Sequence, residues 1–453
     1  MYLPMPIPSS CSEVMKKLTD AGYEVYVVGG CVRDHLRGLP PHDYDMTTNA
    51  TPEEMLEIFR DMRCIETGLK HGTLTVLSQG EPYEVTTYRV DGEYLDHRHP
   101  VAVCFTRDLS GDLSRRDFTM NAIAYHPEKG YIDPFGGILD IEAGCIRTVG
   151  SPYRRFEEDA LRILRAIRFA SVTGFTIEEE TKQALFACKD LLKHISVERI
   201  REELLKLLAG EYATPILREY REIVAVCLPE VTPMFDCPQN TQYHLFDVWE
   251  HSIQVVGRLP KDPFLRFVGL LHDVAKPVMR TTDKFGQDHF KGHPVTGAEM
   301  IVAIMTRLRF DSKSIERARL LVLHHDDRTP PKRNKVLRLL SKVGYENFLT
   351  LTTLAEADSL SQNISHPVNI QNRADLEETR LLGIALEEEG ACYRIRDLAV
   401  DGTVVMGVTG AKGPGVGAIL ETLLHDVMDG KVENESQALQ NHMMRMHIER
   451  TSL

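Results

Sequence analysis

The sequence predicts an α+β protein whose N-terminal part mixes strands with helices and whose remaining, longer part is helical. Two observations predict this class. Residues 1–150 alternate short runs rich in Val, Thr and Tyr with turns, which is typical of strands. After Gly150 the apolar residues recur at helical spacing along most of the chain. A length of 453 residues favours roughly three domains of about 150 residues each.

Residues 1–150 contain three strand-like runs and one well-marked helix. The runs are YEVYVVGG (23–30), GTLTVLS (72–78) and PYEVTTYRV (82–90). The helix covers 51–62, because a Thr-Pro pair precedes two glutamates and an apolar pattern at helical spacing. The polar stretch 91–115 has little periodicity, and we expect it to be a long mobile loop.

The helical part begins with two segments that carry start and stop signals. One continuous helix is expected over 155–174, ending at Gly174, and another over 196–210, with Ser196 as its N-cap. Residues 228–244 contain three prolines and indicate a boundary between domains. We therefore expect four parts, which are a head (1–150), a neck (151–227), a helical metal domain (228–385) and a C-terminal tail (386–453).

Composition limits the classes of protein. The net charge is −13, so any nucleic-acid contact must depend on local basic patches, such as Lys332, Arg333, Lys335 and Arg338. None of the nine cysteines forms a C-x-x-C pair, which argues against a zinc ribbon or a disulfide framework and favours the cytoplasm. We find no signal peptide, and no apolar run approaches the roughly 20 residues of a membrane helix.

An acidic pair follows a diglycine early in the chain. If Asp43 and Asp45 lie on a strand, their side chains point to the same face, and two adjacent carboxylates are a site for Mg²⁺. Glu84, in a second strand-like run, is the candidate third carboxylate. Gly29 and Gly30 lack Cβ atoms, so their backbone N–H groups can approach a triphosphate closely.

Several motifs in residues 23–210 resemble a known family. The segment GGCVRDHLRGLPPHDYDMTT, and later TGLKHGTLTV, RRDFTMNAIAY, IDPFGGILDIEAGCIRTVG and RFEEDALRILRAIRFA, are similar in order and spacing to the class II tRNA nucleotidyltransferases and bacterial poly(A) polymerases. The resemblance implies a mixed-sheet, polymerase-beta-like head followed by an all-α neck. It also implies that Asp43 and Asp45 hold the catalytic Mg²⁺.

The resemblance extends to residues that would bind the nucleotide. Arg33 is available for the charge of a triphosphate, and RRDFTMN would lie near the sugar and phosphates. EDALR would place Asp159 and Arg162 where the base is read. The full predicted nucleotide set is Gly29, Gly30, Arg33, Arg116, Asp117, Asn121, Asp159, Arg162, Arg165 and Arg168.

The hydrogen-bonding groups of Asp159 and Arg162 also predict base recognition independently of the family resemblance. At positions i and i+3 of one helix the two side chains share a face. Aspartate accepts from the exocyclic amine of cytosine or adenine, whereas arginine donates to a ring nitrogen or carbonyl. Uracil and guanine present a carbonyl in place of that amine, so the pair would accept CTP and ATP and reject UTP and GTP. An ordinary salt bridge on a solvated helix face is the alternative.

A second constellation lies between 251 and 358. His251, His272, Asp273 and Asp358 occur within or at the end of apolar helical runs and resemble the ligands of HD-superfamily phosphohydrolases. Imidazole and carboxylate groups in a helical bundle can hold divalent ions, although the identity of the metal is open. The resemblance also implies that Lys276 lies near a bound phosphate. His293 and one of the pair 324–325 are candidates for a second ion.

These features predict an enzyme that adds CCA to the 3′ end of tRNA from CTP and ATP, with an accessory HD phosphohydrolase activity. The loop 89–105, in which Arg98, His99 and Pro100 stand where the family has R-R-P, indicates CCA or A-only addition. Poly(A) polymerase is a further alternative. A nucleotide sensor with an inactive head and an active HD domain is an alternative from another class. The sequence leaves the oligomeric state open.

Overall fold

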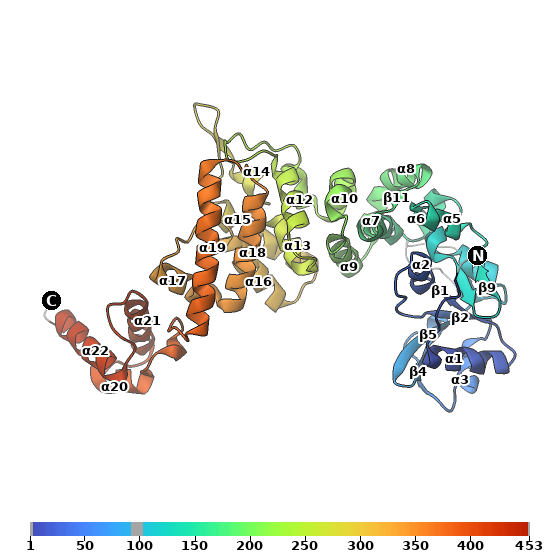
Figure 1. The fold of residues 1–453 in the computed structure, drawn as a ribbon, viewed down its shortest axis with the longest axis horizontal. Helices are drawn as coiled ribbons and strands as arrows, with labels where there is room; N and C mark the ends of the chain where they lie inside the picture. The colour runs from blue at the N-terminus through green and yellow to red at the C-terminus, as the bar shows by residue number, and fades with distance from the viewer. Residues whose placement is uncertain (1–2, 92–102, 452–453) are drawn as a thin grey trace. The chain divides into compact units, whose positions relative to one another are not determined.

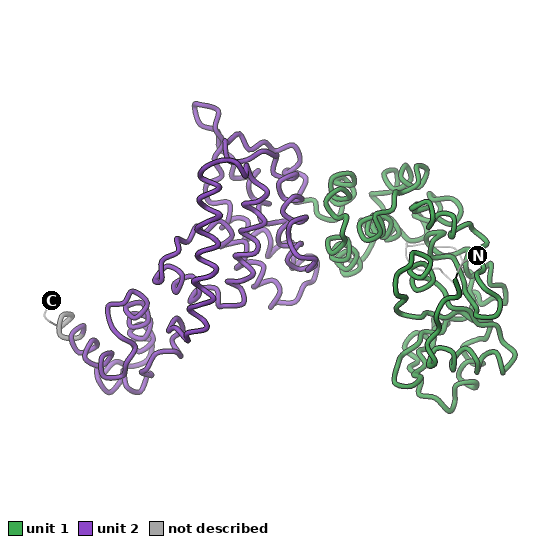
Figure 2. Tube along the Cα trace, in the orientation of Figure 1, with its two compact units in different colours: residues 1–229 green, residues 230–453 purple. Residues whose placement is uncertain are grey.

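The computed structural model describes residues 3–91 and 103–451. The chain divides into two compact units, residues 1–229 and 230–453, which Figure 2 distinguishes by colour. The predicted division into four parts, at 150, 227 and 385, stays a prediction.

A seven-stranded sheet forms the centre of the head in the order β3-β4-β5-β2-β1-β8-β9. β2 runs parallel to β5, and the other neighbours are antiparallel, so the predicted mixed sheet is confirmed. The strands are β1 (Val25–Val28), β2 (Met46–Thr48), β3 (Arg63–Ile65), β4 (Thr73–Ser78), β5 (Glu81–Thr87), β8 (Ala124–His126) and β9 (Gly130–Ile132).

Short helices accompany this sheet (Figure 1), together with a separate antiparallel pair of strands. They are α1 (Ser9–Asp20), α2 (Gly30–Leu36), α3 (Pro52–Ile58), the 3-10 turn η1 (Leu69–His71), β6 (Arg89–Asp91), β7 (Val103–Phe105), α4 (Leu109–Ser114), the 3-10 turn η2 (Thr119–Asn121) and α5 (Gly137–Glu142). Thr51 and Glu54 cap α3 reciprocally, as the sequence predicts. The prediction of a loop over 91–115 is wrong for its described part, because residues 103–105 and 109–114 form β7 and α4.

Helices follow the head within the first unit. They are α6 (Pro152–Glu158), α7 (Leu161–Thr173), α8 (Glu179–Cys188), the 3-10 turn η3 (Lys189–His194), α9 (Val197–Leu208), α10 (Ala213–Glu219) and α11 (Arg221–Cys227), with a parallel pair β10 (Cys145–Ile146) and β11 (Thr176–Ile177). The continuous helix expected over 155–174 is wrong, because the backbone at Asp159 is extended (φ −140°, ψ 102°) and separates α6 from α7. α7 ends where predicted, at Gly174 with φ 75°.

The second unit is built almost entirely of helices. Its elements are η4 (Pro229–Met234), α12 (Val248–Arg258), α13 (Pro263–Leu271), α14 (Lys276–Met279), the hairpin β12 (Thr281–Thr282) and β13 (Asp288–His289), α15 (His293–Arg307), α16 (Ser312–His324), α17 (Arg333–Val343), α18 (Tyr345–Leu360), α19 (Pro367–Glu388), η5 (Ile395–Asp397), α20 (Gly402–Thr409), α21 (Pro414–Met428) and α22 (Ser436–Thr451). α12, α13, α16 and α18 pack together. Of the predicted metal ligands, His251 lies on α12 and Asp358 on α18, and His272 and Asp273 directly follow α13.

The described residues contain no single helix that is both long and apolar enough to cross a membrane. α20 and α21 meet such a criterion only as a pair, and that pair is bent by 103°.

Candidate functional site

Three carboxylates gather where β2 and β5 run side by side. Asp43 and Asp45 precede β2 and do not lie within it, so the supposition that both lie on a strand is not met. Asp43 adopts a left-handed backbone (φ 49°), and its carbonyl accepts the Asp45 N–H at 2.9 Å. Met46 pairs with Val85, so Asp45 lies next to Glu84 of β5. The acidic pair therefore leads into the strand by a tight turn, and Glu84 joins it from the neighbouring strand.

These three side chains are exposed, yet they influence one another. The surrounding protein removes some water from Asp45, and the nearby Glu84 and Asp43 charges repel its own. Together these effects raise the pKa of Asp45 to about 6, against the opposing effect of Arg116. A divalent cation would relieve this repulsion. The acidic cluster thus fits a metal site on chemical grounds.

Gly29 brings the start of α2 close to this cluster. Its backbone has φ 83°, which favours glycine, and a Cβ added there would lie 3.4 Å from Arg116 Nη1 and 4.0 Å from Asp45 Oδ2. Any side chain would therefore occupy the space between the guanidinium and the carboxylate. The diglycine leaves this space open.

A chain of hydrogen bonds links three elements behind the carboxylates. Arg33 Nη1 of α2 donates to Asn121 Oδ1 at 2.8 Å. Asn121 Nδ2 donates to Asp117 Oδ1 at 3.1 Å, and Arg165 Nε of α7 donates to Asp117 Oδ2 at 2.8 Å. Burial alone would raise the pKa of Asp117, but the Arg165 charge and these hydrogen bonds hold it below its ordinary value. The predicted residues of RRDFTMN and α7 thus form one connected network.

Phe169 of α7 lies at the centre of three arginines. The guanidinium carbons of Arg33, Arg165 and Arg168 are 5.1, 5.4 and 3.6 Å from the centroid of its ring. Arg168 Nε also donates to Glu203 of α9 at 2.9 Å. Cation–π contacts and ion pairs therefore hold these cations in fixed positions.

The base-reading pair differs most from its predicted geometry. Asp159 and Arg162 do not share a helix, because the chain breaks between α6 and α7 at Asp159. Asp159 accepts two hydrogen bonds from Arg199 of α9, at 2.8 and 3.3 Å. Arg162 instead donates to Glu158 at 2.8 Å and to the carbonyl of Arg115 at 2.9 Å. The alternative of a salt bridge between Asp159 and Arg162 is wrong for the same reason.

Arg199 is the partner that the sequence did not reveal. It lies 40 residues beyond Asp159, on the predicted helix SVERIREELLKLL, and no spacing rule connects the two positions. The R-H-P loop residues Arg98, His99 and Pro100 lie outside the described residues.

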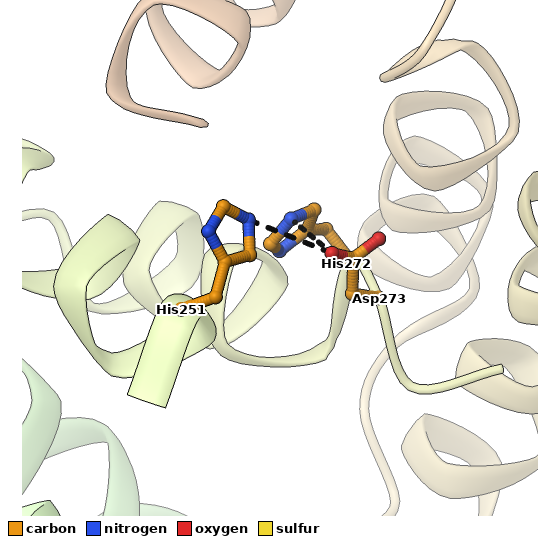
Figure 3. A group of neighbouring side chains, drawn as sticks. All are labelled: His251, His272 and Asp273. Atoms are coloured by element: carbon orange, nitrogen blue, oxygen red, sulfur yellow. Dashed lines mark ion pairs between the residues drawn. The ribbon is translucent and has the colours of Figure 1, made fainter. Parts of the chain in front are cut away.

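The second unit holds a compact cluster of histidines around Asp273 (Figure 3). Asp273 Oδ2 lies 3.2 Å from His272 Nε2 and 3.5 Å from His251 Nε2. Its Oδ1 lies 3.3 Å from His293 Nε2 and 3.5 Å from His325 Nε2. One carboxylate therefore faces two histidine pairs, and each pair together with Asp273 has the spacing of a metal site.

Asp358 and Lys276 complete the surroundings of this cluster. Asp358 Oδ1 lies 2.8 Å from His251 Nε2 and 3.9 Å from His272 Nε2. Lys276 Nζ lies 2.7 Å from Asp273 Oδ2. Burial would raise the pKa of Asp273, but the neighbouring imidazole and ammonium charges hold it well below its ordinary value. All four residues predicted as ligands of the HD site are thus brought together.

Backbone carbonyls orient the imidazole rings. His272 Nδ1 lies 2.7 Å from the carbonyl of Gly269, and His293 and His325 make equivalent contacts at 2.8 and 2.7 Å. A carbonyl only accepts, so each Nδ1 carries a proton, and each Nε2 is the atom that would present a lone pair to a metal ion bound at the centre.

Several buried polar atoms of the cluster also lack a well-oriented hydrogen-bond partner. The Nε2 atoms of His293 and His325 are 3.2 Å apart, where two lone pairs repel unless a proton or cation intervenes. Within the described residues, His251 Nε2, His272 Nε2 and both Asp273 oxygens are buried without a well-oriented hydrogen-bond partner. The donor set therefore fits divalent metal ions.

Two further histidines and a pocket adjoin the cluster. His324 turns away to Asp327 at 2.7 Å, so His325 is the member of this pair that joins the cluster. His244 packs edge-on against His251 at 5.4 Å, and its burial lowers its pKa to about 3. His244 was not predicted, since it lies in the proline-rich segment taken as a boundary. A pocket of about 480 Å³ opens beside the cluster.

Three known domain families match separate parts of the chain. The poly A polymerase head domain matches residues 25–147, the probable RNA- and SrmB-binding site of polymerase A matches residues 174–234, and the HD domain matches residues 241–364.

Curated relatives match the first part of the chain most strongly. The CCA-adding enzyme of Geobacillus thermodenitrificans is 52% identical over 209 residues, which cover 46% of this chain and 51% of that enzyme. The CCA-adding enzyme of Oceanobacillus iheyensis is 42% identical over 261 residues, covering 58% of this chain and 62% of that enzyme. The chain thus spans about half, or somewhat more, of the length of the curated relatives it matches.

Solved structures match the whole chain. The Bacillus stearothermophilus CCA-adding enzyme in complex with CTP is 30% identical, with a TM-score of 0.75 and coverage of 100% of both chains. The Thermotoga maritima CCA-adding enzyme complexed with tRNA is 20% identical, with a TM-score of 0.56 and coverage of 98% of this chain and 96% of that chain. The second match shows the fold alone.

The fold, the domain matches and the two clusters define a class, the nucleotidyltransferases with a poly A polymerase-type head and an HD domain. The family resemblance predicted from the sequence is thereby confirmed. Because 30% identity extends over the full length of both chains, the chain belongs to the CCA-adding enzyme family.

Proposed function

We propose that this enzyme adds CCA to the 3′ end of tRNA, using CTP and ATP without a nucleic-acid template. One observation carries the proposal. Asp43, Asp45 and Glu84 gather beside Gly29 in a chain that aligns end to end with a CCA-adding enzyme in complex with CTP. The intact carboxylates and the connected RRDFTMN network disfavour a nucleotide sensor with an inactive head.

The proposed reaction is an in-line displacement at the α-phosphate. The RNA 3′-hydroxyl attacks phosphorus, the bond to the pyrophosphate breaks, and the hydroxyl proton passes to solvent. Asp43, Asp45 and Glu84 would hold Mg²⁺, which when bound lowers the pKa of the attacking hydroxyl and stabilises the leaving group. Arg33 and Arg116 would counter the triphosphate charge, and the space left by Gly29 would admit its oxygens.

Base selection is assigned to Asp159 and Arg162. The amine of cytosine or adenine would compete with Arg199 for the Asp159 carboxylate, whereas uracil and guanine offer no donor at that position. Arg162 would donate to the base only after releasing Glu158 or a carbonyl. The nearby Asp117 and Asn121 would contact the ribose, and Arg165 and Arg168 would supply further positive charge.

A test of this proposal uses tRNA that lacks its 3′ end, with CTP and ATP supplied separately and together. Addition of CCA is expected. Addition of A alone, or of long A tracts, would instead indicate an A-adding enzyme or a poly(A) polymerase. Asp43→Ala should abolish addition but preserve tRNA binding. Glu81→Gln is the control on the same strand as Glu84, and it should preserve both addition and tRNA binding. Normal addition by Asp43→Ala would contradict the mechanism.

We further propose that the HD cluster holds divalent metal and hydrolyses a phosphate ester. His251, His272, Asp273 and Asp358 would be the ligands. The Nε2 atoms of His251 and His272 and both Asp273 oxygens are buried without a well-oriented hydrogen-bond partner, which supports the assignment. Bound metal would supply an activated water and neutralise phosphate oxygens. Lys276 would contact the phosphate.

Metal analysis and phosphatase assays test the HD proposal. The purified protein should contain a divalent ion and release phosphate from p-nitrophenyl phosphate. His272→Ala should lose both properties. His324→Ala is the matched control, because this ring points to Asp327 outside the cluster, and it should retain both. Metal-free protein that is unaffected by His272→Ala would refute the assignment.

A reaction on tRNA with cellular nucleotides also leads us to propose a cytoplasmic location.

A further inference from the structure

One pocket of the second unit lies between three helices and the turn that follows α16. α17, α18 and α19 pack together (Figure 1), and residues 324–330 line one side of the pocket, which holds about 140 Å³. The residues that line it from α19 are Asn372, Asp375, Leu376 and Thr379. At spacings of three, four and seven residues they share one helix face and cover about 10 Å along its axis. The pocket is therefore long enough for an extended, chain-like molecule.

The charged side chains of this pocket are mostly acidic. They are Asp326, Asp327, Asp358, Asp375 and a single cation, Arg328. Asp358 belongs to the HD cluster, and Asp327 is engaged by His324 at 2.7 Å. Arg328 lies 3.9 Å from Asp326, a long contact between exposed groups that offsets little charge. The lining is therefore negative on balance, which disfavours phosphates and favours a cation.

Asp375 carries much of the charge that remains for a ligand. It lines this pocket but not the one beside the HD cluster, so a metal ion at the cluster would not use it. Gln371 Nε2 donates to its Oδ1 at 2.7 Å, and this neutral amide leaves the negative charge uncompensated. Asp375 is half-buried, which strengthens its attraction for a cation above that of a fully exposed carboxylate.

The remainder of the lining combines apolar walls with a buried hydroxyl. The apolar side chains are Leu339, Leu351, Ala355 and Leu376. Ser359 of α18 lines the same pocket and is 9% exposed. Within the described residues its Oγ has no hydrogen-bond partner. A buried hydroxyl in this state is unfavourable, and a ligand that brings an N–H donor would satisfy it.

We propose that this pocket binds a linear aliphatic polyamine. One ammonium group pairs with Asp375 and a second with Asp326. The methylene groups between them pack against Leu351 and Leu376 and leave water. An N–H of the ligand donates to Ser359 Oγ. The site is separate from nucleotide addition in the head and requires no metal in the HD cluster.

Simpler cations match only part of this lining. A divalent metal ion prefers several oxygen ligands and gains nothing from leucine side chains. A single ammonium group reaches one acid and leaves the rest of the 10 Å slot unfilled. A nucleoside lacks the positive charge that Asp375 and Asp326 favour. Two or more ammonium groups joined by methylenes satisfy both the acids and the apolar walls.

The test measures amine binding to the full-length, RNA-free enzyme by titration calorimetry. Millimolar Mg²⁺ is present throughout, so acidic sites suited to a metal ion are already occupied. The probes are spermidine, putrescine, butylamine and adenosine. Putrescine and butylamine form a matched pair, because both have four carbons but butylamine has one ammonium group. The salt concentration is raised from about 0.05 to about 0.3 M in separate titrations.

Three variants accompany the wild type. Asp375→Asn removes the charge and keeps the shape of that side chain. Leu376→Phe narrows the pocket with no change of charge. Glu377→Gln is the matched control, because Glu377 is an exposed acid on the same helix and points away from the pocket face. Thermal unfolding of each variant checks that the second unit is folded.

Spermidine should bind at one site per chain, more tightly than putrescine, and butylamine should not bind measurably. Asp375→Asn and Leu376→Phe should each weaken spermidine binding roughly tenfold, from the loss of a charged hydrogen bond or of space. Glu377→Gln should stay within about twofold of the wild type. Higher salt should weaken binding because it screens the ion pairs.

Four outcomes would overturn the inference. Butylamine bound as tightly as putrescine would show that paired acids are not read. Equal losses in Asp375→Asn and Glu377→Gln would indicate a diffuse attraction to acidic surface. Adenosine that displaces spermidine would make the pocket a nucleoside site. Folded wild-type protein that binds no spermidine at any salt concentration would refute the site outright.

Discussion

Replacement of Asp273 by asparagine tests the electrostatics of the HD cluster without metal. The substituted amide would keep the shape of the side chain but remove its charge, so Lys276, 2.7 Å away and 6% exposed, would lose its carboxylate. Breaking a buried ion pair costs about 3–5 kcal/mol. We expect about 3 kcal/mol, the low end of that range, because the amide oxygen still accepts a hydrogen bond from the ammonium.

Trp249 provides the assay. It is the only tryptophan in the chain, it is 2% exposed, and it lies on α12 two residues before His251. Its fluorescence should therefore report unfolding of the second unit during urea titration at pH 8 in EDTA. With an m value of about 3 kcal/mol/M, the expected loss lowers the urea midpoint by about 1 M.

A second substitution distinguishes charge from shape. Asp273→Asn/Lys276→Gln removes the unpaired ammonium, and we expect it to recover at least half of the lost stability. With the Lys276→Gln single variant completing the cycle, the coupling energy should be at least about 1.5 kcal/mol. If Asp273→Asn is as stable as the wild type, or if the double variant is no more stable than the single one, the reasoning about a buried ion pair is refuted.

Four further predictions concern both units. Asp45→Asn should slow nucleotide addition roughly a thousandfold or more, the scale of losing a catalytic group, with tRNA binding unchanged in a gel-shift assay. Asp159→Ala should raise misincorporation of UTP and GTP relative to CTP and ATP roughly tenfold, measured by product sequencing. Gly137→Ala places a Cβ 2.1 Å from the Thr119 carbonyl oxygen and should destabilise the first unit by about 2 kcal/mol or more, measured by calorimetry. Adding Mn²⁺ to chelated protein at a hundred times its Kd should stabilise the second unit by about 2.7 kcal/mol and raise its Tm by roughly 5–10 °C, and His272→Ala should abolish that shift.

Local patterns predicted the elements of the head well. The strands over 23–30, 72–78 and 82–90 occur as β1, β4 and β5. In β4 and β5 buried and more exposed residues alternate, and that period of two is visible in the sequence, whereas β1 is a short run of buried residues bounded by glycine. The cap at Thr51 is equally local. The gathering of Asp43, Asp45 and Glu84 was also foreseen, since an adjacent pair of carboxylates suggested a metal site and Glu84 offered a third carboxylate on a neighbouring strand.

Features that depend on distant partners were not predictable. The break between α6 and α7 leaves no proline or glycine signal at Asp159, whose extended backbone instead accompanies a bidentate bond to Arg199. The position of Asp273 between two histidine pairs depends on how α13, α15 and α16 meet. Periodicity shows which face of a helix is buried but not what it faces.

The carbonyl contacts of the HD histidines link metal affinity to secondary structure. His272, His293 and His325 each bond the carbonyl three residues earlier, so a ring keeps its direction only while the neighbouring turn of backbone keeps its shape. Fraying of one turn at the end of α13 or α16 would rotate a donor atom away from the centre. Loss of the ion and loosening of these helix ends should therefore be a single thermodynamic event, and slow hydrogen exchange of the backbone amides in these turns would be a direct sign of a loaded site.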